Sequence, residues 1–501
     1  MEPSQVAHWY RNQHVFVTGA TGFMGKILVE KILRSCPEVA AVYILIRTKK
    51  GKDSAQRLED FLDCPIFEQL KTTSRGSIEK LRCVEGDITQ PNCGLSEVNL
   101  AQLEKRITSV FHMAANVRFD QPVKSAVQLN TGGTLNVLEL ACRFPDLKVF
   151  VHVSTSYCHC DVTELEERLY RAPQDPRKML DLVKWMDDEL LETLTPTLLK
   201  NSPNSYAYTK CLTEQLVTEY SSKLNIAITR PSIVTCVAKE PIPGWVDNLN
   251  GPTGIIVAGG KGILRTMLAD ITHKADYVPV DMAINSILTV AWKTGSEPRK
   301  AEPEVYHITA NRDNSITWGE ALEIAKRHIL NYPYSVCLWY PGGSPKTTYL
   351  MHVLAAFFFH IIPAYVVDFL LQLTGNKPFL VNLQKRLHHG LKVLHYYTTR
   401  PWFFHNKKFF ELYASLTDKD REIFYYNEGP FDHEEYLLNY VLGARKYCVK
   451  EGMETVPYAR KVMRRLYYLD LAKNVILYGL MLWLFYLFVT KFLDVIGNPL
   501  I

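Results

Sequence analysis

Tyr206 and Lys210 form the residue pair in this sequence whose types and spacing suit acid–base chemistry. Both lie in the segment SYAYTKCLTEQL (205–216), four positions apart, so on a helix their side chains project from one face. An isolated phenol has a pKa of about 10, and a nearby ammonium group stabilises the phenolate and brings that pKa toward the working range. Tyr208 points almost to the opposite side, in an i, i+4 row with Leu212. We expect Tyr206 and Lys210 to be catalytic and Tyr208 to pack on an apolar face.

A glycine-rich turn lies near the N-terminus, in HVFVTGATGFMGKILVEKIL (14–33), between an expected strand and an expected helix. Its glycines follow the pattern G-x-x-G-x-x-G. Glycine lets the backbone turn tightly and approach a pyrophosphate, whose charge then rests on amides at the helix N-terminus. The turn predicts a dinucleotide site with contacts from Thr18, Gly19, Thr21, Gly22, Phe23 and Gly25.

The second expected strand ends in a basic segment that bears on the choice of nucleotide. Roughly 20 residues after the glycines, an NAD enzyme places an acidic residue on the ribose hydroxyls. This chain has Arg47 there, followed by Thr48, Lys49 and Lys50. Cations suit a 2'-phosphate, so we predict NADPH with contacts from Arg47 and Lys50. The alternative is a solvated basic loop.

Short apolar runs alternate with longer stretches of helical spacing over the first 235 or so residues. This alternation predicts an α/β fold, a Rossmann-type doubly wound parallel sheet. The predicted strands are HVFVTGA, AAVYILIR, LRCVEGD, SVFHMAA, KVFVHVS and IAITRPS. From about Glu240 the chain is rich in Pro, Gly and Asn, which is typical of a substrate-binding part.

Beyond about residue 345 the pattern is helical. Thr417 with Asp420 and Asp432 with Glu435 predict helix starts, and Gly443 predicts a helix end. We expect a reductase domain over 1–345, a helical C-terminal domain over 346–465 and a membrane segment with a short tail over 466–501.

Overall composition narrows the class of protein. The 501 residues carry a net charge of +5, too mild and dispersed for a nucleic-acid-binding protein, and the mean hydropathy of −0.08 excludes a polytopic membrane protein. The N-terminal segment MEPSQVAHWYRNQ has no apolar core of the kind a secretory signal needs, so we expect the body in the cytosol and the cysteines as free thiols. Cys158, His159 and Cys160 are expected in a strand, without a metal.

Residues 474–490, NVILYGLMLWLFYLFVT, are apolar on every face and carry no charge. They predict a membrane segment, with a buried C-terminal helix as the alternative. More basic residues precede this segment than follow it, which predicts that the body faces the cytosol. Before it are Arg460, Lys461, Arg464, Arg465 and Lys473, and after it is Lys491.

An earlier apolar stretch begins at Tyr349 and is interrupted by polar residues and a proline, which makes it a poor spanning helix. We expect either a kinked element at the membrane surface or along an acyl-chain passage, or ordinary core packing. The interruptions are His352, His360, Pro363, Asp368 and Gln372.

Several segments together resemble the fatty acyl-CoA reductases, a branch of the extended short-chain dehydrogenase/reductase superfamily. They include TGATGFMGKILVEKILRSCPEV, VHVSTSY, SYAYTK, RPSIV, PGWVDNLNGPTG, GKGILRTM, VPVD, LTDKDREIFYY and NYVLGARKY. The resemblance implies reduction of a long-chain fatty acyl-CoA to a primary alcohol, through an aldehyde, with two NADPH and release of CoA. It also implies a membrane-lipid environment, in the peroxisomal or endoplasmic reticulum membrane, and a role in wax ester or ether lipid synthesis.

The same resemblance implies roles for particular residues. Thr155 would hold the substrate oxygen, with Ser154 and Ser156 as rivals, and Lys210 would hold the nicotinamide ribose. No nucleophilic cysteine is required, so Cys158 and Cys211 are expected to be packed thiols. The implied cofactor contacts are Asp87 and Ile88 in EGDIT, Asn130 in QLNTGGTLN (otherwise a helix cap), and Pro231 and Ser232 in RPSIV.

Two other functions remain open from the sequence. One is a membrane-bound dehydrogenase of the same superfamily that acts on a sterol, a sugar nucleotide or another hydrophobic carbonyl or alcohol. The other is a lipid-surface scaffold whose dinucleotide fold no longer catalyses. The presence of Thr155, Tyr206 and Lys210 together argues against the scaffold.

Overall fold

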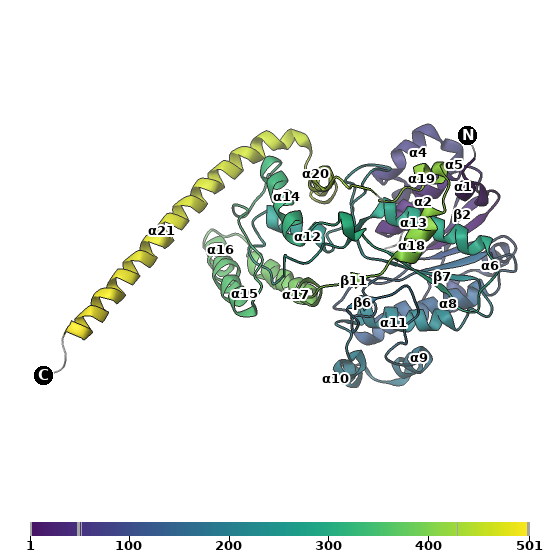
Figure 1. Cartoon of the computed structure of the whole chain (residues 1–501), viewed down its shortest axis with the longest axis horizontal. Coiled ribbons are helices and arrows are strands. Elements are labelled where there is room, and N and C mark those ends of the chain that lie inside the picture. Colours follow the sequence, from purple (N-terminus) through teal and green to yellow (C-terminus); the bar gives the residue numbers. More distant parts are fainter. Residues whose placement is uncertain (1–2, 48–50, 52, 428, 498–501) are drawn as a thin grey trace.

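A seven-stranded parallel sheet forms the centre of the computed structural model, which describes residues 3–47, 51, 53–427 and 429–497 (Figure 1). The strand order is β10-β7-β5-β4-β1-β2-β3. Each neighbouring pair of strands is parallel. Helices cover both faces of such a sheet, so both faces of each strand are buried, and this explains the near-continuous apolar runs in the sequence. The strands are β1 (His14–Thr18), β2 (Ala41–Ile46), β3 (Leu81–Glu85), β4 (Ser109–His112), β5 (Val149–Val153), β7 (Ile226–Pro231) and β10 (Glu304–Ile308).

The six strands predicted from apolar runs are all present, and the doubly wound fold is confirmed. The edge strand β10 was not predicted, because its run EVYHI is short and follows an irregular segment. Helices α2 (Phe23–Ser35) and α13 (Val280–Ser296) contribute to the core on one face of the sheet, and α8 (Gly133–Ala141) and α11 (Ser205–Thr218) to the core on the other.

Smaller elements complete this part of the chain. They are α1 (Gln5–Trp9), α3 (Ser54–Leu62), α4 (Glu68–Thr73), α5 (Arg75–Ile78), α6 (Glu97–Glu104), α7 (Val123–Ala126), α9 (Pro176–Trp185) and α10 (Asp188–Leu199), with the short strands β6 (Glu164–Leu165), β8 (Ile233–Thr235) and β9 (Tyr277–Pro279).

Beyond about residue 345 the chain is mainly helical, as predicted. Helices α12 (Pro252–Gly260), α14 (Trp318–Asn331) and α20 (His433–Gly443) share a core of their own. The chain then returns to the sheet: β11 (Phe403–Phe404) pairs with β6, and α18 (Lys407–Ala414) and α19 (Asp418–Ile423) pack beside α13 and α1. The helical half is therefore fastened to the sheet at several points.

The predicted helix starts are confirmed, but the predicted helix end is wrong. Thr417 caps α19 and Asp432 caps α20, each through a side chain that accepts a backbone N–H. The α-helical hydrogen bonding of α20 ends at Gly443, but the chain stays helical through a π-helical turn to Cys448, so Gly443 does not stop the helix. Gly443 is needed for another reason: a Cβ there would overlap the carbonyl of Gly244, on a loop that crosses the helix.

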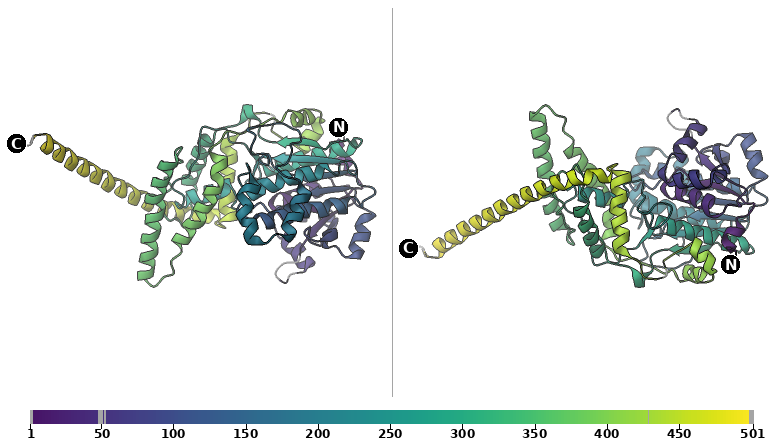
Figure 2. Two further views of the ribbon diagram at one scale, coloured as in Figure 1. Left: turned by 90° about the horizontal axis from the view of Figure 1, so that it is seen from below. Right: turned by 90° about the horizontal axis from the view of Figure 1, so that it is seen from above.

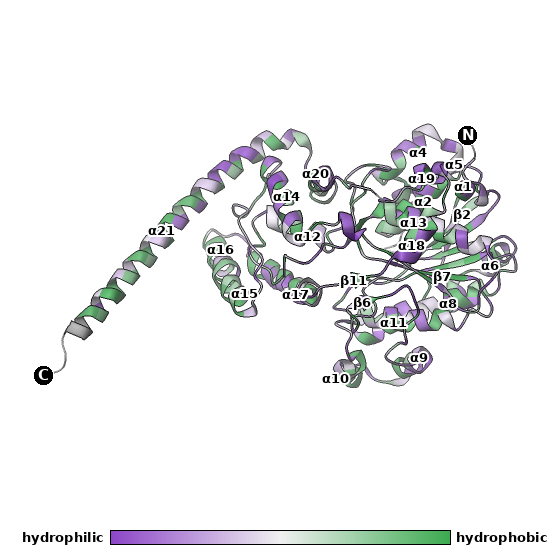
Figure 3. Ribbon diagram, viewed as in Figure 1, coloured by the Kyte–Doolittle hydropathy of each residue, from purple (hydrophilic) through white to green (hydrophobic). Residues whose placement is uncertain are grey.

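Two segments are long and apolar enough to cross a membrane, Tyr349–Leu373 and Met453–Leu493. The second overlaps α21 (Val456–Gly497), which leaves the body as one long helix with its apolar window exposed on all sides (Figures 1 and 3). The alternative of a buried C-terminal helix is therefore wrong. The first segment comprises α15 (Tyr349–Ala356), a π-helical turn (Phe357–Ile361) and α16 (Ile362–Leu373). Helix α16 packs against α17 (Leu380–Thr398). This group projects at the end of the body from which α21 departs (Figure 2).

Candidate active site

The turn between β1 and α2 has the geometry of a pyrophosphate cradle. Gly19 has a φ of +76°, and a Cβ there would lie 2.7 Å from the amide nitrogen of Ala114. A Cβ at Gly25 would overlap the carbonyl of Gly19. Gly22 caps α2 without a side-chain bond, so the first amides of the helix remain available to an anion. The residues present therefore fit a dinucleotide.

The other predicted residues of this turn contribute less through their side chains. The hydroxyl of Thr18 is buried in the sheet, 2.8 Å from Nδ1 of His112. The ring of Phe23 stacks on Trp245 with 5.5 Å between centroids. Thr21 is exposed. Cofactor contacts from this turn would therefore come mainly from its backbone.

Arg47 and Asp87 lie together at the ends of neighbouring strands, where the adenosine half of the cofactor is expected. Arg47 directly follows β2, and its Nη1 lies 3.8 Å from Oδ2 of Asp87 beyond β3. Ile88 is buried against Gly133 at the start of α8. The predicted contact Lys50 lies outside the described residues.

Asn130 is not a helix cap, because it lies within a π-helical turn (Val127–Gly132) that joins α7 to α8. Its Oδ1 accepts the N–H of Asn116 at 2.8 Å, and its Nδ2 donates to Thr209 Oγ1 at 3.0 Å. Asn130 thus fixes the loop after β4 beside α11, the helix that carries Tyr206.

The two tyrosines of α11 occupy different environments, as their spacing predicts. Asn204 begins the helix, accepting the N–H of Ala207 at 2.9 Å. Tyr206 borders a large cavity, whereas Tyr208 is fully buried in a separate cluster that includes Leu212. The row continues through Leu216 and Tyr220, which are buried in the sheet core.

Lys210 lies beneath Tyr206, with Nζ 6.0 Å from the phenol ring centre and donating to the carbonyl of Val153 at 2.7 Å. Burial lowers the pKa of Lys210 to about 8. Burial also raises the pKa of Tyr206 above its ordinary value. The expected lowering of the Tyr206 pKa is therefore absent: burial deprives a phenolate of hydration, and the Lys210 ammonium is held by a backbone carbonyl.

Of the three hydroxyls after β5, Thr155 borders the cavity. Its Oγ1 accepts the N–H of Tyr157 at 3.3 Å. Ser156 is fully buried and donates to the carbonyl of Arg230 at 2.7 Å, while the Ser154 hydroxyl is buried without a partner in the described structure. This placement favours Thr155 over its rivals. Ser232, predicted to lie near the nicotinamide, lines the same cavity, whereas Pro231 ends β7 beside it.

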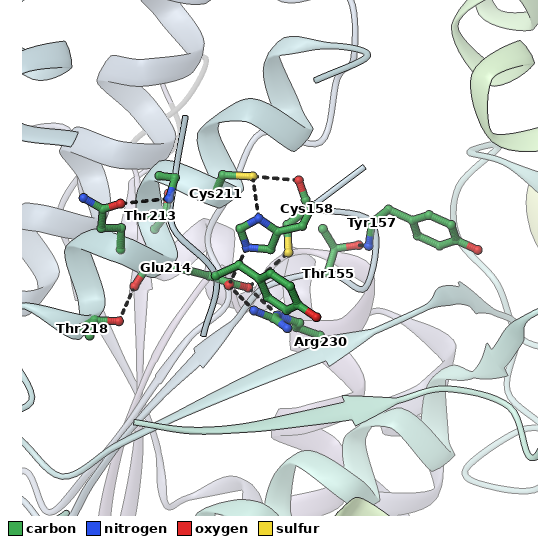
Figure 4. A network of polar contacts seen from close by, with 12 residues as sticks. Thr155, Tyr157, Cys158, Cys211, Thr213, Glu214, Thr218 and Arg230 are labelled. Atoms are coloured by element: carbon green, nitrogen blue, oxygen red, sulfur yellow. Dashed lines mark hydrogen bonds and ion pairs between the residues drawn. The ribbon is translucent and has the colours of Figure 1, made fainter. Parts of the chain in front are cut away.

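A buried ionic network that the sequence analysis missed joins the elements that carry these residues (Figure 4). Glu214 of α11 accepts from Arg230 of β7 at 2.6 and 2.9 Å. Burial opposes ionisation of Glu214, but the bonds from Arg230 outweigh it and hold the pKa of this carboxyl well below its ordinary value. The signal in the sequence was Arg230, the one charged residue in the strand IAITRP, whereas Glu214 lies in a helix that already carries Lys210 and gave no such signal.

Cys158 and His159 complete this network from the loop after β5. They lie in a turn, not in the predicted strand, because β5 ends at Val153. Cys158 Sγ is 3.3 Å from Glu214 Oε1, and His159 Nε2 is 3.3 Å from Oε2. The three ligand atoms lie within 4.8 Å of one another, as in a metal site. Arg230, however, already occupies both oxygens of Glu214, and its charge would repel a cation.

Cys211 is buried beside these residues, with Sγ 2.8 Å from the carbonyl of Cys158. Burial raises the pKa of Cys211 to about 11, which favours the thiol. Cys211 is not one of the described residues that line the cavity. Its environment is that of a packed thiol.

The cavity has a volume of about 1000 Å³ and lies between the sheet and the C-terminal helices. Thr155, Tyr206 and Ser232 line it from the sheet, and its other walls are mainly apolar faces of α12, α14, α17 and α20. Tyr397 of α17 joins the two sides, because its hydroxyl accepts from Asn204 at 2.8 Å. Tyr397 was not predicted, since its contact is with a residue far away in the sequence.

Comparison with known proteins gives concordant matches. Two family models match, and both are described as male sterility protein. The first, an NAD-binding model, matches residues 17–287, and the second matches residues 359–451. The chain is 38% identical to fatty acyl-CoA reductase 1 of Xenopus laevis, over 94% of this chain and 92% of that protein. It is 37% identical to fatty acyl-CoA reductase 1 of Homo sapiens, with the same coverage. It is 36% identical to fatty acyl-CoA reductase 2 of Mus musculus, over 96% and 93%.

Solved structures support the fold. The reductase (R) domain of a non-ribosomal peptide synthetase from Mycobacterium tuberculosis superposes with a TM-score of 0.57 at 16% identity, over 88% of this chain and 95% of that one. The terminal R domain of the myxalamid pathway gives a TM-score of 0.53 at 19% identity, over 86% and 90%. Together with the NAD-binding match and the glycine turn, they show a Rossmann-type domain for a nicotinamide cofactor.

Proposed function

The chain belongs to the fatty acyl-CoA reductase family, and on this premise we propose that it reduces a long-chain fatty acyl-CoA to a primary alcohol with NADPH and releases coenzyme A. The observation that carries the proposal is the cavity of about 1000 Å³, which places Tyr206 and Thr155 in the wall of a space otherwise lined mainly by apolar side chains. A scaffold would not need these polar groups there, and a sugar nucleotide would not suit the apolar walls.

The cavity has separate places for the two parts of an acyl-CoA. The acyl chain would lie along apolar walls that include Ile256 of α12, Leu391 of α17 and Met267 from the segment after α12. Lys385, Arg386 and Arg400 are exposed where they border the cavity and would hold the CoA phosphates. The thioester would then lie between them, at Tyr206.

The side chains at the site can stabilise both reductions. NADPH, when bound, supplies the hydride for each. The hydroxyls of Thr155 and Tyr206 would donate to the carbonyl oxygen as it gains negative charge. The hemithioacetal then collapses, the carbon–sulfur bond breaks, and CoA leaves as a thiolate to give the aldehyde. In the second reduction Tyr206 gives its proton to the alkoxide, and Lys210 holds the ribose and stabilises the phenolate that remains.

The preference for NADPH rests on Arg47. This residue is more than half exposed at the end of β2, and its guanidinium could bond a 2'-phosphate. We expect Arg47→Ala to raise the KM for NADPH by about tenfold or more, the value of one charge-assisted hydrogen bond, and to leave the KM for NADH little changed. Equal changes for both nucleotides would contradict the assignment.

The test of the reaction is its stoichiometry. Purified full-length protein with palmitoyl-CoA should consume two NADPH for each CoA released and form hexadecanol, measured by absorbance, thiol titration and gas chromatography. One NADPH per CoA with accumulation of aldehyde would remove the second reduction from the proposal. Turnover of a sterol without turnover of acyl-CoA would replace the substrate.

We also propose that α21 anchors the enzyme, with the catalytic body in the cytosol and the short tail across a peroxisomal or endoplasmic reticulum membrane. The exposed apolar faces of α21 and the basic residues that precede them support this orientation. The alcohol would serve wax ester or ether lipid synthesis. Protease added to intact organelles should digest the body; protection of the body would reverse the orientation.

A further inference from the structure

Three of the polar residues that interrupt the apolar segment 349–373 face the protein: His352, His360 and Asp368. His360 is buried, and its Nε2 accepts the N–H of Arg265 at 2.8 Å. Asp368 accepts the N–H groups of Phe379, Leu380 and Val381 at 3.0, 2.8 and 2.9 Å, at the start of α17. His352 is 3.2 Å from the hydroxyl of Thr266. This side of the helix is therefore fixed to the body.

The opposite side is apolar and largely exposed, with Lys473 of α21 beside it, 5.9 Å from the ring centre of Phe359. Leu350 and Leu373, near its two ends, are each 68% exposed, and Phe358 at the π-helical turn is 56% exposed. An apolar surface of this size is rare on a soluble monomer. Its side chains are Tyr349, Leu350, Met351, Val353, Leu354, Phe357, Phe358, Phe359, Ile361, Ile362, Tyr365, Val366, Phe369, Leu370 and Leu373.

The position of this surface relates it to a bilayer. Segment 349–373 lies at the end of the body from which α21 departs, and it runs across the direction of α21 (Figure 2). If α21 crosses a membrane, segment 349–373 lies along the membrane surface. It cannot cross as well, because its polar side is bonded to the body along its length.

The surrounding charge suits anionic lipid. Between Asp368 and Glu411 the sequence has no acidic residue, while Lys377 and Lys392 are exposed in and before α17. Each exposed lysine or arginine near a membrane surface is attracted to anionic headgroups by about 1 kcal/mol. A second copy of this chain would bring the same basic residues, without acidic ones from this stretch, against this side.

The segment is also one layer away from the cavity. Leu264 and Met267 line the cavity, and the residues between them, Arg265 and Thr266, are those bonded to His360 and His352. Helix α17, whose first amides donate to Asp368, lines the cavity with Leu387, Leu391 and Leu394. Lipid against segment 349–373 would thus adjoin the walls proposed to hold the acyl chain.

We propose that residues 349–373 form an interfacial helix, buried by its apolar side in the lipid of the cytosolic leaflet, through which long-chain substrate passes from the bilayer to the cavity. The contact with lipid stands independently, whereas the passage of substrate rests on the proposed function. Contact of this helix with the bilayer would bring the cavity close to the membrane, so a poorly soluble acyl chain would not have to cross water.

Photo-crosslinking of the full-length chain tests the contact with lipid. Benzoylphenylalanine replaces Phe358 or Phe369 in protein reconstituted into phosphatidylcholine vesicles that contain about one fifth phosphatidylserine, an anionic surface. We expect lipid adducts by mass spectrometry at both positions and at Trp483 in α21, but none at Trp185, which is 70% exposed on α9. Adducts at position 483 alone, or protein–protein cross-links at position 358, would overturn the proposal.

A kinetic test addresses the passage of substrate. In the double variant Phe358→Asp, Phe369→Asp the anchor α21 is unchanged, so the protein should remain on vesicles. We expect the KM for membrane-bound palmitoyl-CoA to rise by about tenfold, with little change for water-soluble butyryl-CoA. Equal changes for both substrates would contradict the passage. If the wild-type protein reduced no acyl-CoA, the proposed function would be wrong. The photo-crosslinking result would still show whether segment 349–373 contacts lipid.

Discussion

Tyr206 and Tyr208 differ in what their hydroxyl groups can reach. The Tyr206 hydroxyl borders the cavity, whereas that of Tyr208 is buried without a hydrogen-bond partner in the described structure. We expect Tyr206→Phe to lower kcat by about 10²–10⁴, the usual contribution of a positioned acid. Tyr208→Phe should leave kcat within about twofold and leave the melting temperature unchanged or higher, since it removes an unsatisfied buried group.

Steady-state kinetics and thermal melting of the two variants check this pair. Each variant serves as the control for the other, because both lose one hydroxyl from the same helix. A large loss of kcat in Tyr208→Phe with none in Tyr206→Phe would reverse the assignment of the two tyrosines.

Lys210 gives the expected pH dependence. Burial lowers its pKa to about 8, so its ammonium form prevails below that pH and is lost as the pH rises through it. Burial raises the pKa of Tyr206, so the phenol remains protonated over the same range. We expect kcat/KM to fall as pH rises through about 8, measured with saturating NADPH. A rise through this range would show that a phenolate, rather than the ammonium, is required.

At the scale of elements, the Glu214–Arg230 pair holds α11 to β7 and to the loop after β5. Tyr206 lies in α11 and Thr155 in the loop after β5, and Ser232 directly follows β7. Removal of one partner leaves a buried charge unpaired, which costs about 3–5 kcal/mol. We therefore expect Glu214→Leu or Arg230→Met alone to destabilise severely, and the double variant to be more stable than either. Chemical denaturation of all three with the wild type completes the cycle.

A second measurement separates positioning from mere stability. The charge of Glu214 raises the pKa of Lys210 against the effect of burial. Glu214→Gln keeps a polar side chain of the same size but removes that charge. We expect the fall in kcat/KM to move to lower pH in this variant. An unchanged pH profile would mean that the pair supports the fold without influencing Lys210.

Local patterns in the sequence predicted most single elements correctly. The apolar runs indicated six strands, the glycine turn indicated the start of α2, and Thr417 and Asp432 indicated helix starts, because each depends on neighbouring residues. The failures involve distant contacts. Gly443 resembles a helix stop until Gly244 is seen against it, and the contact of Tyr397 with Asn204 has no local signature. Burial likewise changed the expected pKa of Tyr206, and spacing alone does not report burial.

For the whole molecule, the fastening of the C-terminal half to the sheet matters most, because the cavity lies between the two. Glu167, beyond β6, accepts the N–H groups of Lys408 and Phe409 at the start of α18 at 2.6 and 3.1 Å. Tyr425 donates to Asp281 at the start of α13. The cavity walls from α17 and α20 are held on either side of these contacts, so their spacing depends on them.

Asp420 provides the sharpest test of this fastening, because it joins α1 near the N-terminus to α19. It is fully buried at the start of α19 and accepts from the hydroxyl of Ser4 at 2.5 Å and the N–H of Val6 at 3.1 Å. Asp420→Ala leaves both donors buried and unpaired, so we expect the free energy of unfolding to fall by about 2–4 kcal/mol. Asp418→Ala, an exposed acid in the same first turn, should cost less than about 1 kcal/mol. Urea denaturation of the detergent-solubilised chain measures both. Equal losses of unfolding free energy in the two variants would show that Asp420 only stabilises the start of α19 and does not hold α1 against it.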